Sequence, residues 1–207
     1  MIKAKKWFWR LLPVGIGIGA IAYYYLSFMP ERIRSNERHA IGALKMLTAA
    51  QADFRANDRD GNGVSDFWTA DVAGLYYVRS AFFPGAPEIR LIDSAVADAD
   101  ARPLQARTPV PYHGYYFIVL DADDSISGTP ESFYKQDTGG RPPMGKVHNT
   151  SRFGFCAYPA EYGLTGKCTF IVNENNTIFR MDSGGKPVTH FPDDGPKDYS
   201  GDLRKMD

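Results

Sequence analysis

The first thirty residues place a long uncharged stretch directly after a cluster of basic side chains. Leu11 to Met29 is a run of 19 residues without a charged side chain, close to the ~20 that a helix needs to cross the hydrocarbon core of a bilayer. Lys3, Lys5, Lys6 and Arg10 precede it, and such a basic excess predicts a cytoplasmic N-terminus. We therefore expect a basic cytoplasmic segment at 1–10, a single transmembrane helix at 11–29, and everything after it on the far side of the membrane.

A cleaved secretory signal is the main alternative, because it shares the order of a basic region followed by an apolar core. A signal would end in small residues at its cleavage site, whereas Tyr23 to Tyr25 are followed here by Leu26, Ser27, Phe28 and Met29. This poor match favours a retained anchor. Gly15 and Gly19 form a G-xxx-G pair, which either lets a second membrane helix approach closely or simply reflects the abundance of glycine in membrane helices.

Composition limits what the remainder of the chain can be. The whole chain of 207 residues, 43% of them hydrophobic, suffices for one sizeable core, or for one core plus a membrane span. The 24 basic side chains balance 24 acidic ones, so no overall positive charge attracts the protein to nucleic acid and we expect no such partner. The expected partners are the lipid bilayer and other membrane-protein subunits.

Segment 30–57 has the periodicity of an amphipathic helix, restarted or kinked at Pro30. Its apolar stripe consists of Ile33, Ala40, Ile41, Ala43, Leu44, Leu47, Ala50 and Phe54. Four strands are expected in the following segment, at 114–120, 152–158, 167–172 and 177–181, the last three pairing antiparallel in sequence order. The sequence thus predicts an α+β domain, with the helix and the loop and sheet part at 58–182 packed together and a polar tail at 183–207.

Cys156 and Cys168 lie on the two arms of the predicted hairpin centred near Tyr162 and Gly163. Their symmetric placement about the turn predicts that they face each other. Outside the cytoplasm such a pair would form a cross-strand disulfide, and the alternative is two buried free thiols.

The sharpest chemical motif follows the amphipathic helix, where oxygen-bearing residues alternate along the chain. The predicted ligands of this loop are Asp58, Asp60, Asn62, the carbonyl of Val64, and Asp66. That spacing, with Gly63 at the turn, resembles the first part of an EF-hand calcium loop. Thr69 stands where an EF-hand has its bidentate glutamate, so a further ligand has to come from elsewhere, for example Asp53 or Asp71. The competing interpretation is a solvated turn, because Asp, Asn and Gly are also preferred there for conformational reasons.

Catalytic motifs are absent from the sequence. His39, His113, His148 and His190 are scattered, without a zinc-protease, haem-attachment or nucleophile-elbow pattern, and no glycine cluster is followed by a phosphate-binding lysine. We therefore expect a protein that is not an enzyme and has no catalytic residues. A cleft gathering His113, His190 and a carboxylate would reverse that expectation.

Two stretches carry a family resemblance. The first resembles the helix that follows the membrane segment in bacterial type IV pilin-like and type II secretion pseudopilin-like proteins. It consists of Asn36-Glu37-Arg38-His39-Ala40-Ile41-Gly42-Ala43-Leu44-Lys45 and continues through Ala49-Ala50-Gln51-Ala52-Asp53-Phe54. The second is similar to the sheet of those proteins and of the bacterial DUF2950 family. It consists of Pro111-Tyr112-His113-Gly114-Tyr115-Tyr116-Phe117, Phe153-Gly154-Phe155, Ala157 to Gly163 and Thr169 to Asn173.

The resemblance implies a helix half in the membrane and half packed on an antiparallel β-meander, as in pilins. It also implies a bacterial inner membrane location with a periplasmic or extracytoplasmic domain, and a structural or accessory subunit of an envelope complex. The alternative is a filament-forming pseudopilin. The junction where a pilin has its leader site argues against this alternative. It reads Lys6-Trp7-Phe8-Trp9-Arg10-Leu11-Leu12 and lacks both the processing site and the helix glutamate. A periplasmic enzyme is the third hypothesis.

Overall fold

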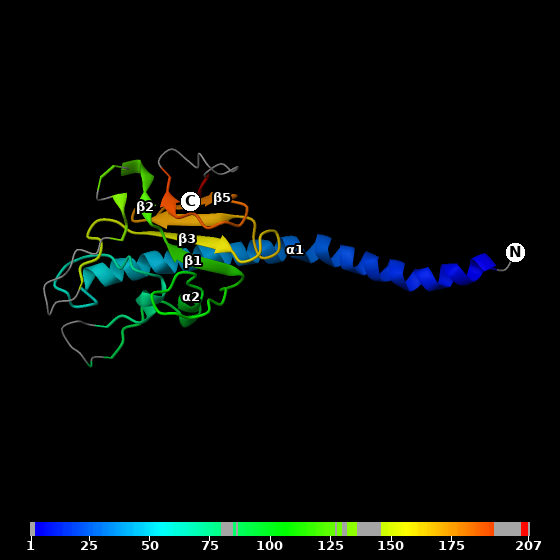
Figure 1. Cartoon of the computed structure of the whole chain (residues 1–207), viewed down its shortest axis with the longest axis horizontal. Helices are drawn as coiled ribbons and strands as arrows, with labels where there is room; N and C mark the ends of the chain where they lie inside the picture. The colour runs from blue at the N-terminus through cyan, green and yellow to red at the C-terminus, as the bar shows by residue number, and fades with distance from the viewer. Residues whose placement is uncertain are drawn as a thin grey trace.

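One helix and one antiparallel sheet organise the chain (Figure 1). The computed structural model describes residues 3–79, 85, 87–126, 128–129, 132–135, 146–192 and 204–206, with side chains described from Ser27 to Pro192. Helix α1 runs from Lys3 to Ala56. It continues through Pro30 without the predicted restart, although this proline lacks the N–H that would donate to the preceding turn. The ribbon of α1 extends well beyond the sheet toward the N-terminus (Figure 1).

The C-terminal part of α1 packs its apolar stripe against the sheet, as predicted. Ala40, Leu44, Leu47 and Phe54 have no exposed surface, and Ile33 is the first buried side chain among those described. The stripe contacts β3 and β4, which lie alongside the helix in Figure 1. At roughly 25 cal/mol per Å² of apolar surface removed from water, this stripe is a major source of stability for the domain.

The sheet has the predicted meander topology. Strands β1 (Tyr115–Val119), β3 (Gly154–Pro159), β4 (Thr169–Asn173) and β5 (Ile178–Met181) pair antiparallel in that order. Short β7 (Arg204–Met206) extends the sheet beyond β5. The described residues before β3 also form shorter elements: η1 (Ala73–Tyr76), α2 (Ser94–Asp98), β2 (Ala122–Asp123) and η2 (Asp124–Ile126).

Alternate side chains of the strands build two apolar clusters on opposite faces of the sheet. The face toward α1 carries Phe117, Phe155 and Phe170, while Ile118 and Ile171 belong to the other face. That second face is covered in part by the segment after β5, where Val188 is buried and β6 (His190–Phe191) pairs parallel with β2. The residues after 182 thus contribute to the packing of the domain.

The predicted disulfide is wrong, because the two cysteines lie on opposite faces of the sheet. Cys156 is paired with Ile171 in the β3–β4 register and belongs to the cluster on the face away from α1. Cys168 precedes β4, packs against the cluster on the α1 face, and both thiols are free. Symmetry about the turn could not reveal this, since a register shift of one residue reverses the face of every side chain.

Among the residues whose side chains are described, no helix is long and apolar enough to cross a membrane. The predicted span at 11–29 falls almost wholly on residues outside that description, and it therefore stays a prediction.

Candidate functional site

The acidic loop, residues 58–66, begins where α1 ends. Asp58 has a φ of 44°, and Gly61 and Gly63 have φ values of 68° and 79°. This left-handed region is open to glycine and is tolerated by Asp better than by most residues. These three positions reverse the chain within a few residues of Ala56.

Side-chain oxygens hold the loop from inside. Asp58 Oδ1 accepts from the backbone N–H of Asn62 at 3.1 Å and Asp58 Oδ2 accepts from Gly63 at 3.0 Å, while Asn62 Oδ1 accepts from Val64 at 2.7 Å. The Val64 carbonyl accepts the N–H of Asp66 at 3.1 Å. Asp60 Oδ1 also accepts from the backbone N–H of Asn62, at 3.4 Å, so all five predicted ligand residues take part in one compact turn.

Three of these side chains point into the domain and meet at the amide nitrogen of Asn62. Asp60, Asn62 and Asp66 are 8%, 3% and 1% exposed. Asn62 Nδ2 lies 2.9 Å from Asp60 Oδ2, 3.1 Å from Asp66 Oδ2 and 2.8 Å from the carbonyl oxygen of Lys146. The second carboxylate oxygen, Asp66 Oδ1, is buried and has no hydrogen-bond partner within the part of the chain that the structure describes.

A distant segment of the chain completes this cluster. The backbone N–H of His148 donates to Asp66 Oδ2 at 2.6 Å, and the N–H of Phe67 donates to the Asn149 carbonyl at 2.7 Å. The rings of Trp68 and His148 lie 4.5 Å apart. Sequence reasoning missed segment 146–149 because these contacts join residues more than eighty positions apart, which no local spacing reveals.

Burial dominates the electrostatics of the loop. It raises the pKa of Asp60 to about 7, and the nearby charge of Asp66 adds to the shift. Burial also raises the pKa of Asp66, against the opposing effect of the hydrogen bond from the His148 backbone. Arg59, the basic residue inside the loop, turns away from it and pairs with Asp53 at 2.8 Å.

The additional acidic residues considered as ligands are engaged elsewhere. Asp53 holds Arg59 and Asn57, whereas Asp71 accepts from Gly74, Leu104 and the Trp68 ring nitrogen. Within the described residues, no three acidic, histidine or cysteine side chains are arranged to hold a metal ion. The Asn62 amide lies between the carboxylates instead.

The histidines do not assemble a catalytic centre in the contacts that the structure describes. The rings of His39 and His113 stack at 3.8 Å, and His190 Nδ1 lies 3.0 Å from Asp124 Oδ1. His148 contacts the acidic loop. His113 and His190 thus have separate partners.

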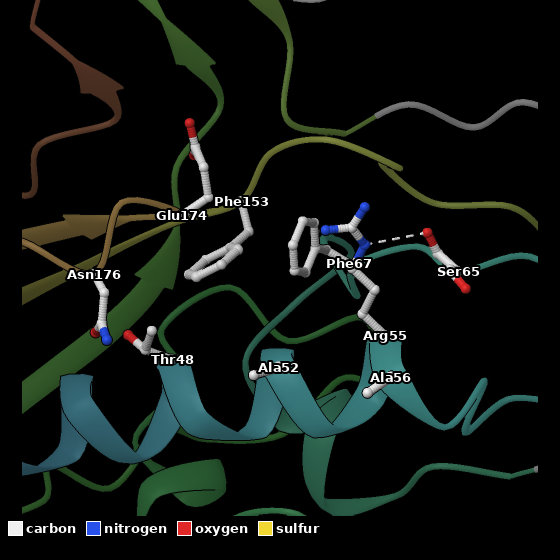
Figure 2. Close-up of a pocket in the computed structure, with 9 residues that line it drawn as sticks. All are labelled: Thr48, Ala52, Arg55, Ala56, Ser65, Phe67, Phe153, Glu174 and Asn176. Atoms are coloured by element: carbon white, nitrogen blue, oxygen red, sulfur yellow. Dashed lines mark hydrogen bonds between the residues drawn. The ribbon is translucent and has the colours of Figure 1, made fainter.

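An open groove of about 550 Å³ lies beside the acidic loop (Figure 2). Arg55 of α1 places its guanidinium 4.8 Å from the centre of the Phe67 ring and donates to the Ser65 carbonyl at 3.4 Å. Phe153 supplies the second aromatic wall, and the carboxylate end of Glu174 points away from α1 in Figure 2. The sequence offered no signal for this groove, since its walls come from α1, the acidic loop and the sheet.

Helix, sheet and acidic loop together define an α+β domain carried on a long N-terminal helix. The model of the family described as "Protein of unknown function (DUF2950)" matches residues 27–193, and the chain belongs to that family. Comparison with curated proteins and with solved structures gives no match.

Proposed function

We propose that the chain is a non-enzymatic structural or accessory subunit of a bacterial envelope complex, held in the inner membrane by the N-terminal part of α1. The observation that carries this proposal is the length of α1 relative to the domain it supports. The helix has 54 residues, or roughly 80 Å at 1.5 Å per residue. Its N-terminal part extends beyond the sheet (Figure 1), and the matched family domain begins only at residue 27, so about half of the helix precedes the domain.

The sequence of that remaining half suits a bilayer. Its 19 uncharged residues at 11–29 match the thickness of the hydrocarbon core, and the basic residues before them favour a cytoplasmic N-terminus. The domain would then stand in the periplasm or outside the cell. A helix packed by its C-terminal half on an antiparallel meander is also the arrangement implied by the pilin-like resemblance, and it supports a scaffolding role.

Membrane fractionation of the full chain tests the anchor. We expect the chain in the membrane fraction, resistant to alkaline carbonate, with its domain digested by protease added to spheroplasts. The double substitution Ile16→Arg and Ile18→Arg places two charges in the uncharged stretch and should release the chain from the membrane. Arg32→Ala and Arg34→Ala, exposed changes on α1 outside that stretch, serve as the matched control. A wild-type chain that is extracted by carbonate would refute the anchor.

Sizing and mass spectrometry after mild-detergent extraction test the role. A discrete complex containing the chain with Met1 retained, together with other membrane proteins, is the expected result. A shortened chain in heterogeneous fibres would overturn the accessory-subunit proposal in favour of a pseudopilin.

A further inference from the structure

We propose that the acidic loop binds one Ca²⁺ ion and that the main-chain carbonyl of Lys146 is one of its ligands, so that the ion ties the end of α1 to segment 146–149. The proposed side-chain ligands are Asp58, Asp60, Asn62 and Asp66. The inference is independent of the membrane anchor, because every residue in it belongs to the domain.

The surroundings of the Asn62 amide nitrogen are crowded with oxygen atoms. Three oxygens, from Asp60, Asp66 and Lys146, lie within 3.1 Å of it. An amide group has only two N–H donors, so it cannot satisfy all three acceptors at once with good geometry. Oxygens that converge on one point, here from the acidic loop and from the distant Lys146, are what a hard cation requires.

Asp66 has one carboxylate oxygen without a partner among the described residues. Its side chain is 99% buried, and Oδ1 has no hydrogen-bond partner in the described structure. The other oxygen of the same carboxylate is already shared with Asn62 and His148, which places the unpartnered oxygen at this cluster. A buried carboxylate oxygen without a donor is unfavourable, and a cation bound beside it removes that penalty.

The carboxylates of the acidic loop bring negative charge into the domain. Asp60 and Asp66 are buried close together, and Arg59 is paired with Asp53. A divalent ion supplies the positive charge that two adjacent buried carboxylates need. An all-oxygen ligand set suits Ca²⁺, which accepts six to eight oxygens at 2.3–2.6 Å, better than the smaller Mg²⁺ with its strict octahedral geometry.

The role of Lys146 follows from the residue that the loop lacks. Thr69 occupies the position of the EF-hand glutamate and is buried, while Asp53 and Asp71 have other partners. The Lys146 carbonyl already faces the amide of Asn62 at 2.8 Å. On binding, a rotation of the Asn62 amide turns Oδ1 toward this point and gives up its hydrogen bond from the Val64 N–H.

Calorimetry and thermal unfolding of the full chain in detergent test the proposal, with Ca²⁺, Mg²⁺ or a chelator at constant ionic strength. We expect one saturable Ca²⁺ site per chain, in the 10⁻⁴–10⁻³ M range of extracellular calcium modules, and an increase in Tm that Mg²⁺ does not reproduce. Asp60→Asn and Asp66→Asn should weaken Ca²⁺ binding at least tenfold. Asp98→Asn removes the same charge at a distant site, where Asp98 is 3.6 Å from Arg107, and should bind like the wild type.

A wild-type chain without heat of binding or Tm shift at 10 mM Ca²⁺, roughly ten times the upper limit of that range, would overturn the site. Unchanged binding in both loop variants would do the same. If neither variant folds, terbium luminescence of the wild-type chain decides the matter. Trp68 lies beside His148 and should sensitise bound Tb³⁺, with the signal lost in Trp68→Phe and displaced by Ca²⁺.

Hydrogen exchange tests the ligand from Lys146 separately. If that carbonyl binds the ion, Ca²⁺ should slow exchange at the amides of 146–149 as well as those of the acidic loop. Protection confined to 58–66 would leave the site in place but refute the Lys146 ligand.

Discussion

At the scale of single residues, the stacked rings of His39 and His113 make the stability of the domain depend on pH. Partial desolvation of the exposed His113 ring and the nearby charge of His39 lower the pKa of His113 below its usual value near 6.5. The folded state therefore binds this proton less readily than the unfolded state. The stabilising contribution of neutral His113 is complete above pH 6.5, and it is lost as the pH falls from there through the lowered folded pKa.

Urea unfolding at pH 7.5 and pH 5 measures this contribution. We expect a lower midpoint at pH 5 for the wild type and a smaller difference for His113→Asn, because asparagine tolerates the φ of 46° at this position. A double-mutant cycle with His39→Gln isolates the stacking term from other titrating groups. Equal pH dependence in wild type and His113→Asn would contradict the assignment to this histidine.

The contact between Gly166 and Tyr115 predicts a purely steric effect of mutation. A Cβ added at Gly166 would lie 2.0 Å from the Tyr115 hydroxyl oxygen, and that hydroxyl donates to the Cys168 carbonyl at 2.8 Å in a fully buried side chain. Gly166→Ala should therefore lower the free energy of unfolding by about 1–3 kcal/mol, measured by urea denaturation. Gly42→Ala is the matched control, since its Cβ meets no atom within 4 Å and alanine favours the helix. Equal destabilisation by both substitutions would rule out the steric explanation.

At the scale of elements, the β3–β4 hairpin determines the chemistry of the two cysteines. Intact mass spectrometry without reductant should give the mass of two free thiols. Burial raises the pKa of Cys156 to about 12 and that of Cys168 to about 11, so both should react slowly with thiol reagents in the native state, Cys156 more slowly because it is completely buried. Denaturant should expose two reactive thiols. A mass lower by two hydrogens would instead indicate a disulfide and a different strand register.

The hairpin also marks the limit of prediction from sequence. Periodicity identified the apolar stripe of α1, because Leu44, Leu47 and Phe54 recur at the spacing of a helix. The four main strands were also identified from local sequence pattern. Turn residues gave the order of the strands. The register that separates Cys156 from Cys168 depends instead on which cross-strand pairs pack best in three dimensions.

The acidic loop divides in the same way. Its internal turn was visible in the spacing of Asp58, Asp60, Asn62 and Asp66, since those contacts are local. The approach of Lys146 and His148 was not, because a connection more than eighty residues away in sequence is positioned by the packing of the whole sheet. The groove at Arg55 was missed for the same reason.

At the scale of the whole molecule, the domain and the N-terminal part of α1 should be separable. The matched family domain begins at residue 27, and the described core begins at Ile33, so we expect a chain without residues 1–26 to keep this core. A chain that begins at Ser27 should therefore unfold cooperatively and leave the membrane fraction. Its urea midpoint should match that of the full chain, because every buried side chain that the structure describes is retained, and the midpoint depends on the free energy of unfolding and on the surface exposed.

A second, shorter chain serves as the control, because it begins after Ile33 and therefore removes part of the described core. A chain that begins at Gly42 loses the buried side chains of Ile33 and Ala40. It also loses Asn36, which donates to the Thr165 carbonyl at 2.9 Å, and Glu37, which accepts from the backbone N–H of Cys168 at 3.2 Å. It should be less stable by several kcal/mol, since burial of one such apolar side chain contributes ~1.5–3 kcal/mol. If the chain from Ser27 were equally destabilised, the first half of α1 would have to contribute to the fold of the domain rather than only to its attachment.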